Sequence, residues 1–146
     1  MNIEVKNTGW RKHVLLHAAS VYFAKKLGYF NKKRTRIKIE LVPGLVKRQG
    51  YRGLANQVSK NLFQIKLDAS LKPQNLIRCL AHEMIHVQQW LSGQMKDMYG
   101  QSFKVQWGKR MYRPEKLAYS KHPWEIQAHK LEKVLYKSFT MAWDSK

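Results

Sequence analysis

The sequence lacks several features that define common classes of protein. Cys79 is the only cysteine among 146 residues, so a scaffold of internal disulfides is excluded and a reducing compartment is expected. No apolar run approaches the length that spans a bilayer. Residues 1–12 also lack the apolar segment and cleavage site of a secretory signal. We therefore expect a cytoplasmic protein that does not bind membranes.

Acidic residues are scarce as well, and the resulting charge indicates an anionic partner. The chain has 9 Asp and Glu against 28 Lys and Arg, a formal net charge of +19. On so small a domain, this charge favours contact with nucleic acid. No motif of a sequence-specific binding protein is found, so we expect contacts with phosphates. A solvated surface without a partner is the alternative. The densest basic run comprises Lys32, Lys33, Arg34, Arg36 and Lys38.

The order of predicted elements indicates an α+β domain. Hydrophobic residues make up 44% of the chain, enough for a core. Helical periodicity predicts helices over residues 10–27, 73–92 and 123 to about 142. Alternation of apolar and polar residues predicts strands over 35–42, 52–57 and 62–68, and a short strand or hairpin within 102–112. Because no linker divides the chain and no βαβ alternation is found, we expect one α+β domain over residues 1–146.

The second predicted helix carries an HExxH motif, His82-Glu83-Met84-Ile85-His86. Residues four apart share one helical face, so the two imidazoles can converge on one ion. A catalytic zinc has three protein ligands and one open position for water. Glu83 is placed to take the proton of that water. Both histidines lie opposite the apolar stripe of the helix, which disfavours a role in the main core.

A third ligand must come from another segment, and the last predicted helix offers several candidates. Glu125 lies in its first turn and can reach a metal held by a neighbouring helix, so it is the third ligand that we expect. His129 is the rival, and can instead orient a ligand or aid the transition state. We interpret Glu132 and Tyr136 as a solvated helix flank, and His122 as a loop residue.

Three segments of the chain resemble SprT-like zinc metallopeptidases, especially the small ones that phages encode. They are FQIKLDASL (residues 63–71), LAHEMIHVQQW (residues 80–90) and PWE (residues 123–125). The resemblance covers roughly residues 10–136. It implies a minimal zincin-like fold, in which a small sheet packs on the HExxH helix between N- and C-terminal helices. It also implies that His82 and His86 bind Zn²⁺ and that Glu83 is the general base.

The sequence departs from this family where the third histidine is supplied. SprT-like proteins carry HGxxF in that segment, and this chain has Tyr99-Gly100-Gln101-Ser102-Phe103. The departure favours Glu125 as the ligand and leaves Tyr99 as a hydrogen-bonding group near the metal. Spartan-type members of the family cleave proteins crosslinked to DNA, so the resemblance implies DNA-associated proteins as a substrate class. For a phage-encoded protein the compartment would be the host cytoplasm.

These observations lead to one expected function and two alternatives. We expect a zinc metallopeptidase that holds a protein or peptide substrate extended along the edge of the sheet, at the strand around Phe63–Asp68. The first alternative is a nucleic-acid-binding or host-interaction protein whose metal site is structural or vestigial. The second is a hydrolase of another bond, because HExxH specifies water activation more firmly than substrate. An open coordination position would indicate catalysis.

Overall fold

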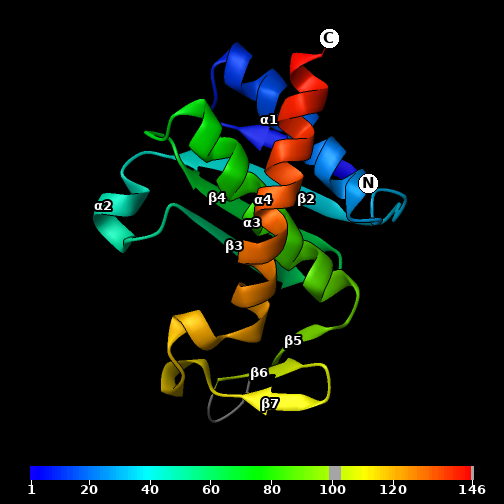
Figure 1. Cartoon of the computed structure of the whole chain (residues 1–146), viewed down its shortest axis with the longest axis vertical. Helices are drawn as coiled ribbons and strands as arrows, with labels where there is room; N and C mark the ends of the chain where they lie inside the picture. The colour runs from blue at the N-terminus through cyan, green and yellow to red at the C-terminus, as the bar shows by residue number, and fades with distance from the viewer. Residues whose placement is uncertain (99–102, 146) are drawn as a thin grey trace.

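The structure, a computed structural model, describes residues 1–98 and 103–145 of the chain (Figure 1). In sequence order its elements are β1 (Asn2–Lys6), α1 (Trp10–Lys26), β2 (Arg36–Val42), α2 (Leu45–Gln49), β3 (Gly53–Ser59), β4 (Leu62–Asp68), α3 (Pro73–Leu91), β5 (Met95–Met98), β6 (Lys104–Trp107), β7 (Arg110–Tyr112), the 3-10 turns η1 (Pro114–Lys116) and η2 (Tyr119–Lys121), and α4 (Pro123–Asp144).

A four-stranded sheet forms one layer of the molecule. Its strand order is β1-β2-β4-β3, in which β3 is antiparallel to β4 and the other pairs are parallel. Ile37 pairs with Phe63 and Ile39 with Ile65, so the apolar positions of both strands share one face. That face is fully buried at these residues, whereas the opposite face carries polar and charged side chains such as Lys38 and Gln64.

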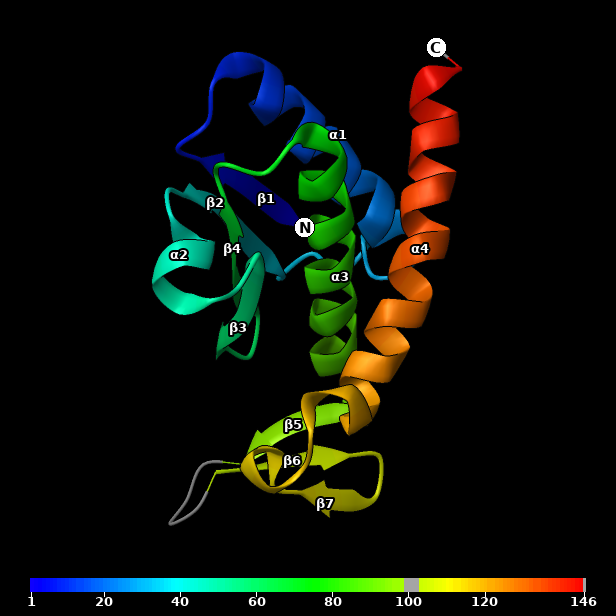
Figure 2. The same ribbon diagram turned by 60° about the vertical axis from the view of Figure 1, so that its left-hand side comes forward.

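Helices cover the apolar face of the sheet in two layers. α1 and α3 pack directly on the strands, and α4 lies on their outer side (Figure 2). Apolar residues of α4, including Ala128 and Phe139, join the same core as the strands and α3. This second contact buries the face of α3 that does not meet the sheet.

A small three-stranded sheet closes the lower end of the molecule in Figure 1. Its order is β5-β6-β7, and all pairs are antiparallel. Met95, Val105 and Trp124 form a separate buried cluster between this sheet and the beginning of α4. The cluster fixes the first turn of α4 next to α3.

The α+β class predicted from the sequence is confirmed. The predicted helices and strands agree with the observed ones to within about two residues where the structure describes them, and the hairpin corresponds to β6 and β7. β1, α2 and β5 were not predicted. The expectation that the strand around Phe63–Asp68 offers a free edge is wrong, because β4 lies between β2 and β3 and its edges are both paired. The edge strands are β1 and β3, and β3 is the one that packs against α3.

Within the described residues, none of the helices combines the length and the apolar character that crossing a bilayer demands.

Candidate metal centre

Two helices supply the side chains of the candidate site. α3 carries His82 and His86 one turn apart, with Glu83 directly after His82, and α4 carries Glu125 in its first turn. His122 precedes α4 and is buried, and its Nε2 lies 3.0 Å from the Pro114 carbonyl oxygen and 2.9 Å from that of Leu117. A ring N–H shared between two backbone carbonyls anchors the start of the helix, so His122 has a structural role in the loop.

Two imidazole nitrogens and one carboxylate group from these helices converge. His82 Nε2 lies 2.8 Å from Glu125 Oε1, His86 Nε2 lies 3.1 Å from Glu125 Oε2, and the two Nε2 atoms are 3.1 Å apart. Tetrahedral zinc with bonds of about 2.0–2.1 Å separates neighbouring ligand atoms by roughly 3.3 Å. The three donors therefore need to move apart by only a few tenths of an ångström to hold this ion.

The opposite nitrogen of each imidazole is fixed by a hydrogen bond. His82 Nδ1 donates to Glu132 Oε1 at 3.0 Å, and His86 Nδ1 donates to Gln89 Oε1 at 2.8 Å. Gln89 is itself held, because its Nε2 donates to the Trp124 carbonyl oxygen and to Gln127 Oε1. Such partners orient metal-binding imidazoles and set their tautomer, so both rings present Nε2 to the centre.

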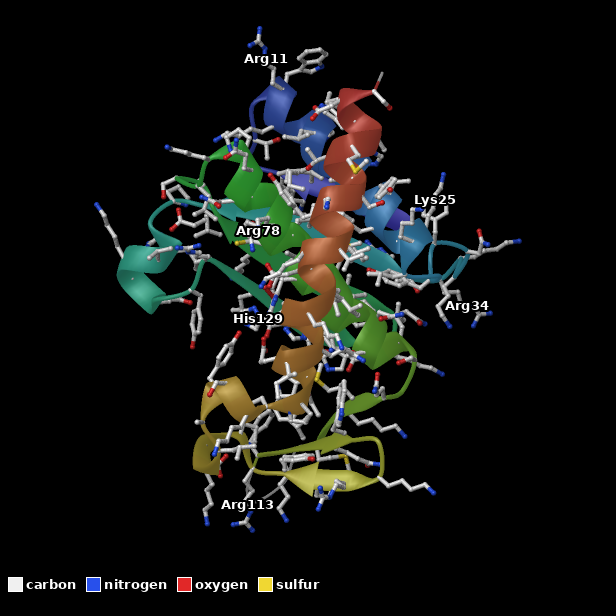
Figure 3. All side chains as sticks on the ribbon, in the orientation of Figure 1. Arg11, Lys25, Arg34, Arg78, Arg113 and His129 are labelled. Atoms are coloured by element: carbon white, nitrogen blue, oxygen red, sulfur yellow. The ribbon has the colours of Figure 1, made fainter. Side chains whose placement is uncertain are left out.

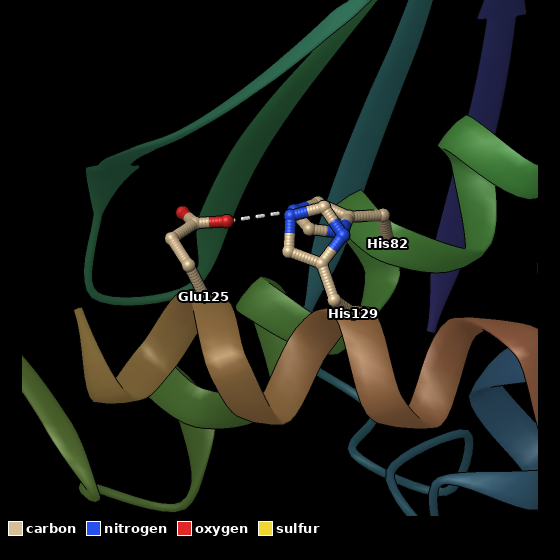
Figure 4. A group of neighbouring side chains, drawn as sticks. All are labelled: His82, Glu125 and His129. Carbon is tan, nitrogen blue, oxygen red and sulfur yellow. Dashed lines mark hydrogen bonds and ion pairs between the residues drawn. The ribbon is translucent and has the colours of Figure 1, made fainter. Parts of the chain in front are cut away.

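His129 is the neighbouring alternative ligand. His82, Glu125 and His129 offer ligand atoms within 4.8 Å of one another, as do His82, Glu83 and His86. Figure 4 shows the ring of His129 beside His82, with Glu125 bonded to His82. However, His129 Nδ1 bonds to Glu132 Oε1 at 2.9 Å and the side chain is half exposed. The tighter triangle of His82, His86 and Glu125 is the better fit.

The site is electrostatically biased toward a cation. Burial lowers the pKa of His82, but hydrogen bonds to Glu125 and Glu132 outweigh it and raise the pKa to about 10. Burial likewise lowers the pKa of His86, but the hydrogen bond to Glu125 and the charge of Glu83 outweigh it, and the net pKa is raised. Burial raises the pKa of Glu125, but hydrogen bonds from both histidines hold it far below its usual range. Carboxylates thus surround two imidazoles, and the same field attracts a divalent ion.

Glu83 differs from the other carboxylates of the site. Its side chain is buried, and burial raises its pKa. It forms no hydrogen bond with any residue that the structure describes. A Cβ placed on Gly53 would lie 3.2 Å from Glu83 Oε2, so the carboxylate lies against the backbone of β3. Glu83 is free to accept a proton from a molecule bound between α3 and β3.

The site opens into a cleft that follows β3. One cavity of about 540 Å³ lies at the Gly50–Gly53 end, and a second of about 430 Å³ lies along residues 53–56. Both are lined by His82 and Glu83. Val105 and Trp124 close the second cavity on the side of the small sheet. The cleft therefore has the candidate centre in its middle and the unpaired edge of β3 along one wall.

Two functional contacts were missed or misjudged from the sequence. Tyr119 in η2 donates its hydroxyl to Glu125 Oε1 at 2.7 Å and lies 3.3 Å from His129 Nε2; no motif or periodicity marks it. The interpretation of Glu132 as a solvated flank is wrong, because Glu132 is only 8% exposed and bonds to His82. Tyr136 is partly buried against the core. Tyr99, expected near the metal, lies outside the described residues.

Cys79 precedes the motif and lines the first cavity. Burial raises the pKa of its thiol to about 11, and the nearby Glu83 adds to the effect. A thiol is a weak nucleophile unless it is ionised. Cys79 therefore does not compete with Glu83 for a catalytic role.

Comparison of the chain with protein-family models, with curated proteins and with solved structures gives no match. The candidate site therefore rests on the motif and on the geometry described above, and the SprT-like assignment stays a prediction.

Proposed function

We propose that the protein is a zinc metallopeptidase of the zincin-like, SprT-like type. The observation that supports this most directly is the convergence of two imidazole Nε2 atoms and the Glu125 carboxylate within 2.8–3.1 Å. Beside them lies the Glu83 carboxylate, which has no hydrogen bond to any of the described residues. The proposed zinc ligands are His82, His86 and Glu125. Three protein ligands leave one position of a tetrahedral ion open, as in catalytic zinc sites.

The residues of the site have distinct roles in peptide hydrolysis. Zinc held by the three ligands would supply the Lewis acidity that polarises a peptide carbonyl and acidifies a water molecule. The Glu83 carboxylate accepts the proton of that water and passes it to the nitrogen of the leaving amine. Burial raises the pKa of Glu83, which strengthens it as a base. Tyr119 holds Glu125 in place through its hydroxyl.

The substrate chain would lie along β3. This strand is at the edge of the sheet, and it lines the cleft from Gly53 to Asn56. An extended peptide can use the free backbone N–H and C=O groups of such an edge as a further strand. The peptide bond nearest Gly53 would then face Glu83. This arrangement replaces the strand predicted from the sequence and keeps the same mode of binding.

Replacing Glu83 tests the proposal. We expect Glu83→Gln to retain zinc, because the ligands are unchanged, and to lose proteolysis by at least about 100-fold, the usual contribution of a positioned general base. Zinc content by atomic absorption and cleavage of an unfolded protein by mass spectrometry are the readouts. Cys79→Ala serves as the matched control one turn earlier on α3 and should retain activity. Equal cleavage by native protein and Glu83→Gln would contradict the mechanism.

The basic surface supports a second proposal, that the protein contacts nucleic acid through phosphates and thereby acts on DNA-associated proteins. Cations are found at separate ends of the molecule: Arg11, Arg34 and Arg113 point outward in different directions (Figure 3). A charge of +19 spread in this way predicts binding with little sequence preference and a steep decrease with salt. Duplexes of unrelated sequence should bind with similar affinity, and log Kd should rise linearly with log salt concentration. Salt-independent binding would contradict it.

A further inference from the structure

A third cavity continues the cleft beyond the candidate centre. It has a volume of about 380 Å³ and shares Trp90 with the cavity that contains His86 and Glu125. β3 passes from one to the other, since Asn56 lines the central cavity and Gln57 lines the third. The indole of Trp90 stacks on Phe63, with ring centroids 5.9 Å apart, and separates the two spaces.

The walls of this third cavity are basic. Lys32, Lys33 and Arg34 come from the loop between α1 and β2, and Lys60 comes from the turn between β3 and β4. The parallel pairing of β2 with β4 brings these loops together, because Arg36 is the partner of Leu62 and its N–H donates to the Asn61 carbonyl at 2.8 Å. The fold thus places Lys60 beside three residues of the most basic run of the sequence.

These four cations have no carboxylate partner among the described residues. All four side chains are exposed, and none forms an ion pair within the part of the chain that the structure describes. Like charges held together in this way repel one another, and an anion bound among them relieves the repulsion. Figure 3 shows Arg34 pointing away from the body of the molecule, so the site is open to a ligand.

We propose that this basic cavity is a specificity subsite that binds an acidic segment of the polypeptide substrate. The inference rests on the proposed peptidase function and adds a substrate preference to it. A polypeptide is favoured over a nucleic acid because the cavity continues the cleft along β3, whose free backbone groups pair with an extended peptide. An extended chain advances about 3.3 Å per residue, so a peptide paired from Gly53 to Gln57 reaches the cavity roughly four to six residues from the scissile bond.

Three peptides with one central sequence provide the test. One carries three glutamates four to six residues on the N-terminal side of the cleavable bond, the second carries them on the C-terminal side, and the third has glutamines at both places. Binding is measured with the Glu83→Gln protein by fluorescence anisotropy at low salt, and kcat/KM is measured with the zinc-loaded native protein. We expect one glutamate peptide to be favoured over the glutamine peptide by about tenfold, as two or three exposed ion pairs would give.

The matched variants differ only in where four positive charges are removed. The cavity variant is Lys32→Gln, Lys33→Gln, Arg34→Gln and Lys60→Gln, and it should lose the preference. The control variant is Lys109→Gln, Lys116→Gln, Lys130→Gln and Lys137→Gln, all exposed and outside the three cavities; it should keep the preference. Circular dichroism verifies that both variants fold.

The outcomes separate this inference from the proposed function. A preference that survives in the cavity variant, or equal binding of all three peptides, would overturn the subsite. Loss of affinity for a single-stranded oligonucleotide in the cavity variant alone, with peptide preference unchanged, would assign the cavity to nucleic acid and also overturn it. Selective binding of a glutamate peptide that zinc-loaded protein leaves intact would support the subsite and contradict the peptidase.

Discussion

At the scale of single residues, Glu132 governs the orientation of two imidazoles from one carboxylate. Its Oε1 accepts hydrogen bonds from His82 Nδ1 and His129 Nδ1, and its Oε2 lies 4.0 Å from Arg78 Nε. Hydrogen bonds from His82 and the charges of both histidines outweigh burial and lower the pKa of Glu132. An ionised acceptor on Nδ1 makes the opposite nitrogen of His82 a stronger ligand.

We therefore expect Glu132→Gln to weaken zinc binding by about 10- to 100-fold, the usual effect of losing such a partner. Competition with a chromophoric chelator measures the affinity. Glu115→Gln, a change at an exposed glutamate of η1, removes the same charge away from the site and should leave the affinity unchanged. Equal affinities of the two variants would show that Glu132 does not act through His82.

Gly53 provides a second residue-scale prediction. A Cβ at this position would lie 3.1 Å from Leu67 Cδ2 and 3.2 Å from Glu83 Oε2, closer than side chains normally approach. We expect Gly53→Ala to displace the Glu83 carboxylate and to lower kcat by about 10-fold or more, since small misplacements of a catalytic group are costly, while zinc content is retained. Gly9→Ala is the control, because a Cβ there meets nothing within 4 Å. An undiminished kcat in Gly53→Ala would contradict the inference that the backbone at Gly53 positions the Glu83 carboxylate.

At the scale of elements, the sequence predicted the segments better than their arrangement. The alternation of Phe63, Ile65 and Leu67 marks β4 clearly, but pairing partners do not follow from alternation. Three residues of β3 are exposed to solvent, including Asn56, as is usual at a sheet edge, and only the assembled order β2-β4-β3 identifies β3 as that edge. Similarly, HExxH and the first turn of α4 predicted the convergent triangle, whereas Tyr119 and Glu132 required the packing of η2 and α4 against α3.

The short helix α2 depends on one carboxylate of the sheet. Asp68 Oδ2 accepts the Val46 N–H at 2.7 Å, and Oδ1 accepts the N–H and hydroxyl of Ser70 at 2.8 and 2.6 Å. The bonds from Ser70 and Val46 lower the pKa of Asp68 below 3.8. Because the folded pKa is the lower one, the ionised group stabilises the fold above the unfolded pKa, and this contribution is lost as the pH falls through the folded pKa.

Asp68→Asn should therefore lower the free energy of unfolding near neutral pH, and its difference from the native protein should shrink as the solution is acidified below the ordinary pKa of aspartate. Urea denaturation at about pH 6 and about pH 2.5 measures both values. Asp144→Asn, at the exposed end of α4, is the control and should have little effect at either pH. A difference for Asp68→Asn that stays constant over this range would contradict the role of the ionised form.

At the scale of the whole molecule, the scarce acidic residues are concentrated where the chemistry is expected. Glu83, Glu125 and Glu132 are three of only nine acidic residues. Glu125 and Glu132 lie at the junction of α3 with α4, where both bond to His82, and Glu83 lies beside them on the β3 side of α3. The basic residues occupy the surface around this junction, with the cluster of Lys32, Lys33 and Arg34 at one end of the cleft. The charge thus has two separable parts, a local acidic centre for a cation and a surrounding basic field for anionic partners.

The acidic centre predicts that zinc stabilises the protein globally, because the proposed ligands lie on two helices of the core. An ion that binds only the folded state and is present at 100 times its Kd raises the free energy of unfolding by about 2.7 kcal/mol. This corresponds to a rise in Tm of roughly 5–10 °C for a chain of this size. We expect that rise in the native protein and not in His86→Ala, as followed by circular dichroism after removal of metal and titration with zinc. The double variant His13→Ala and His17→Ala removes an exposed histidine pair from α1 and should keep the full shift. If the double variant loses the shift and His86→Ala keeps it, the stabilising metal is bound at α1 and the junction of α3 with α4 is not its site.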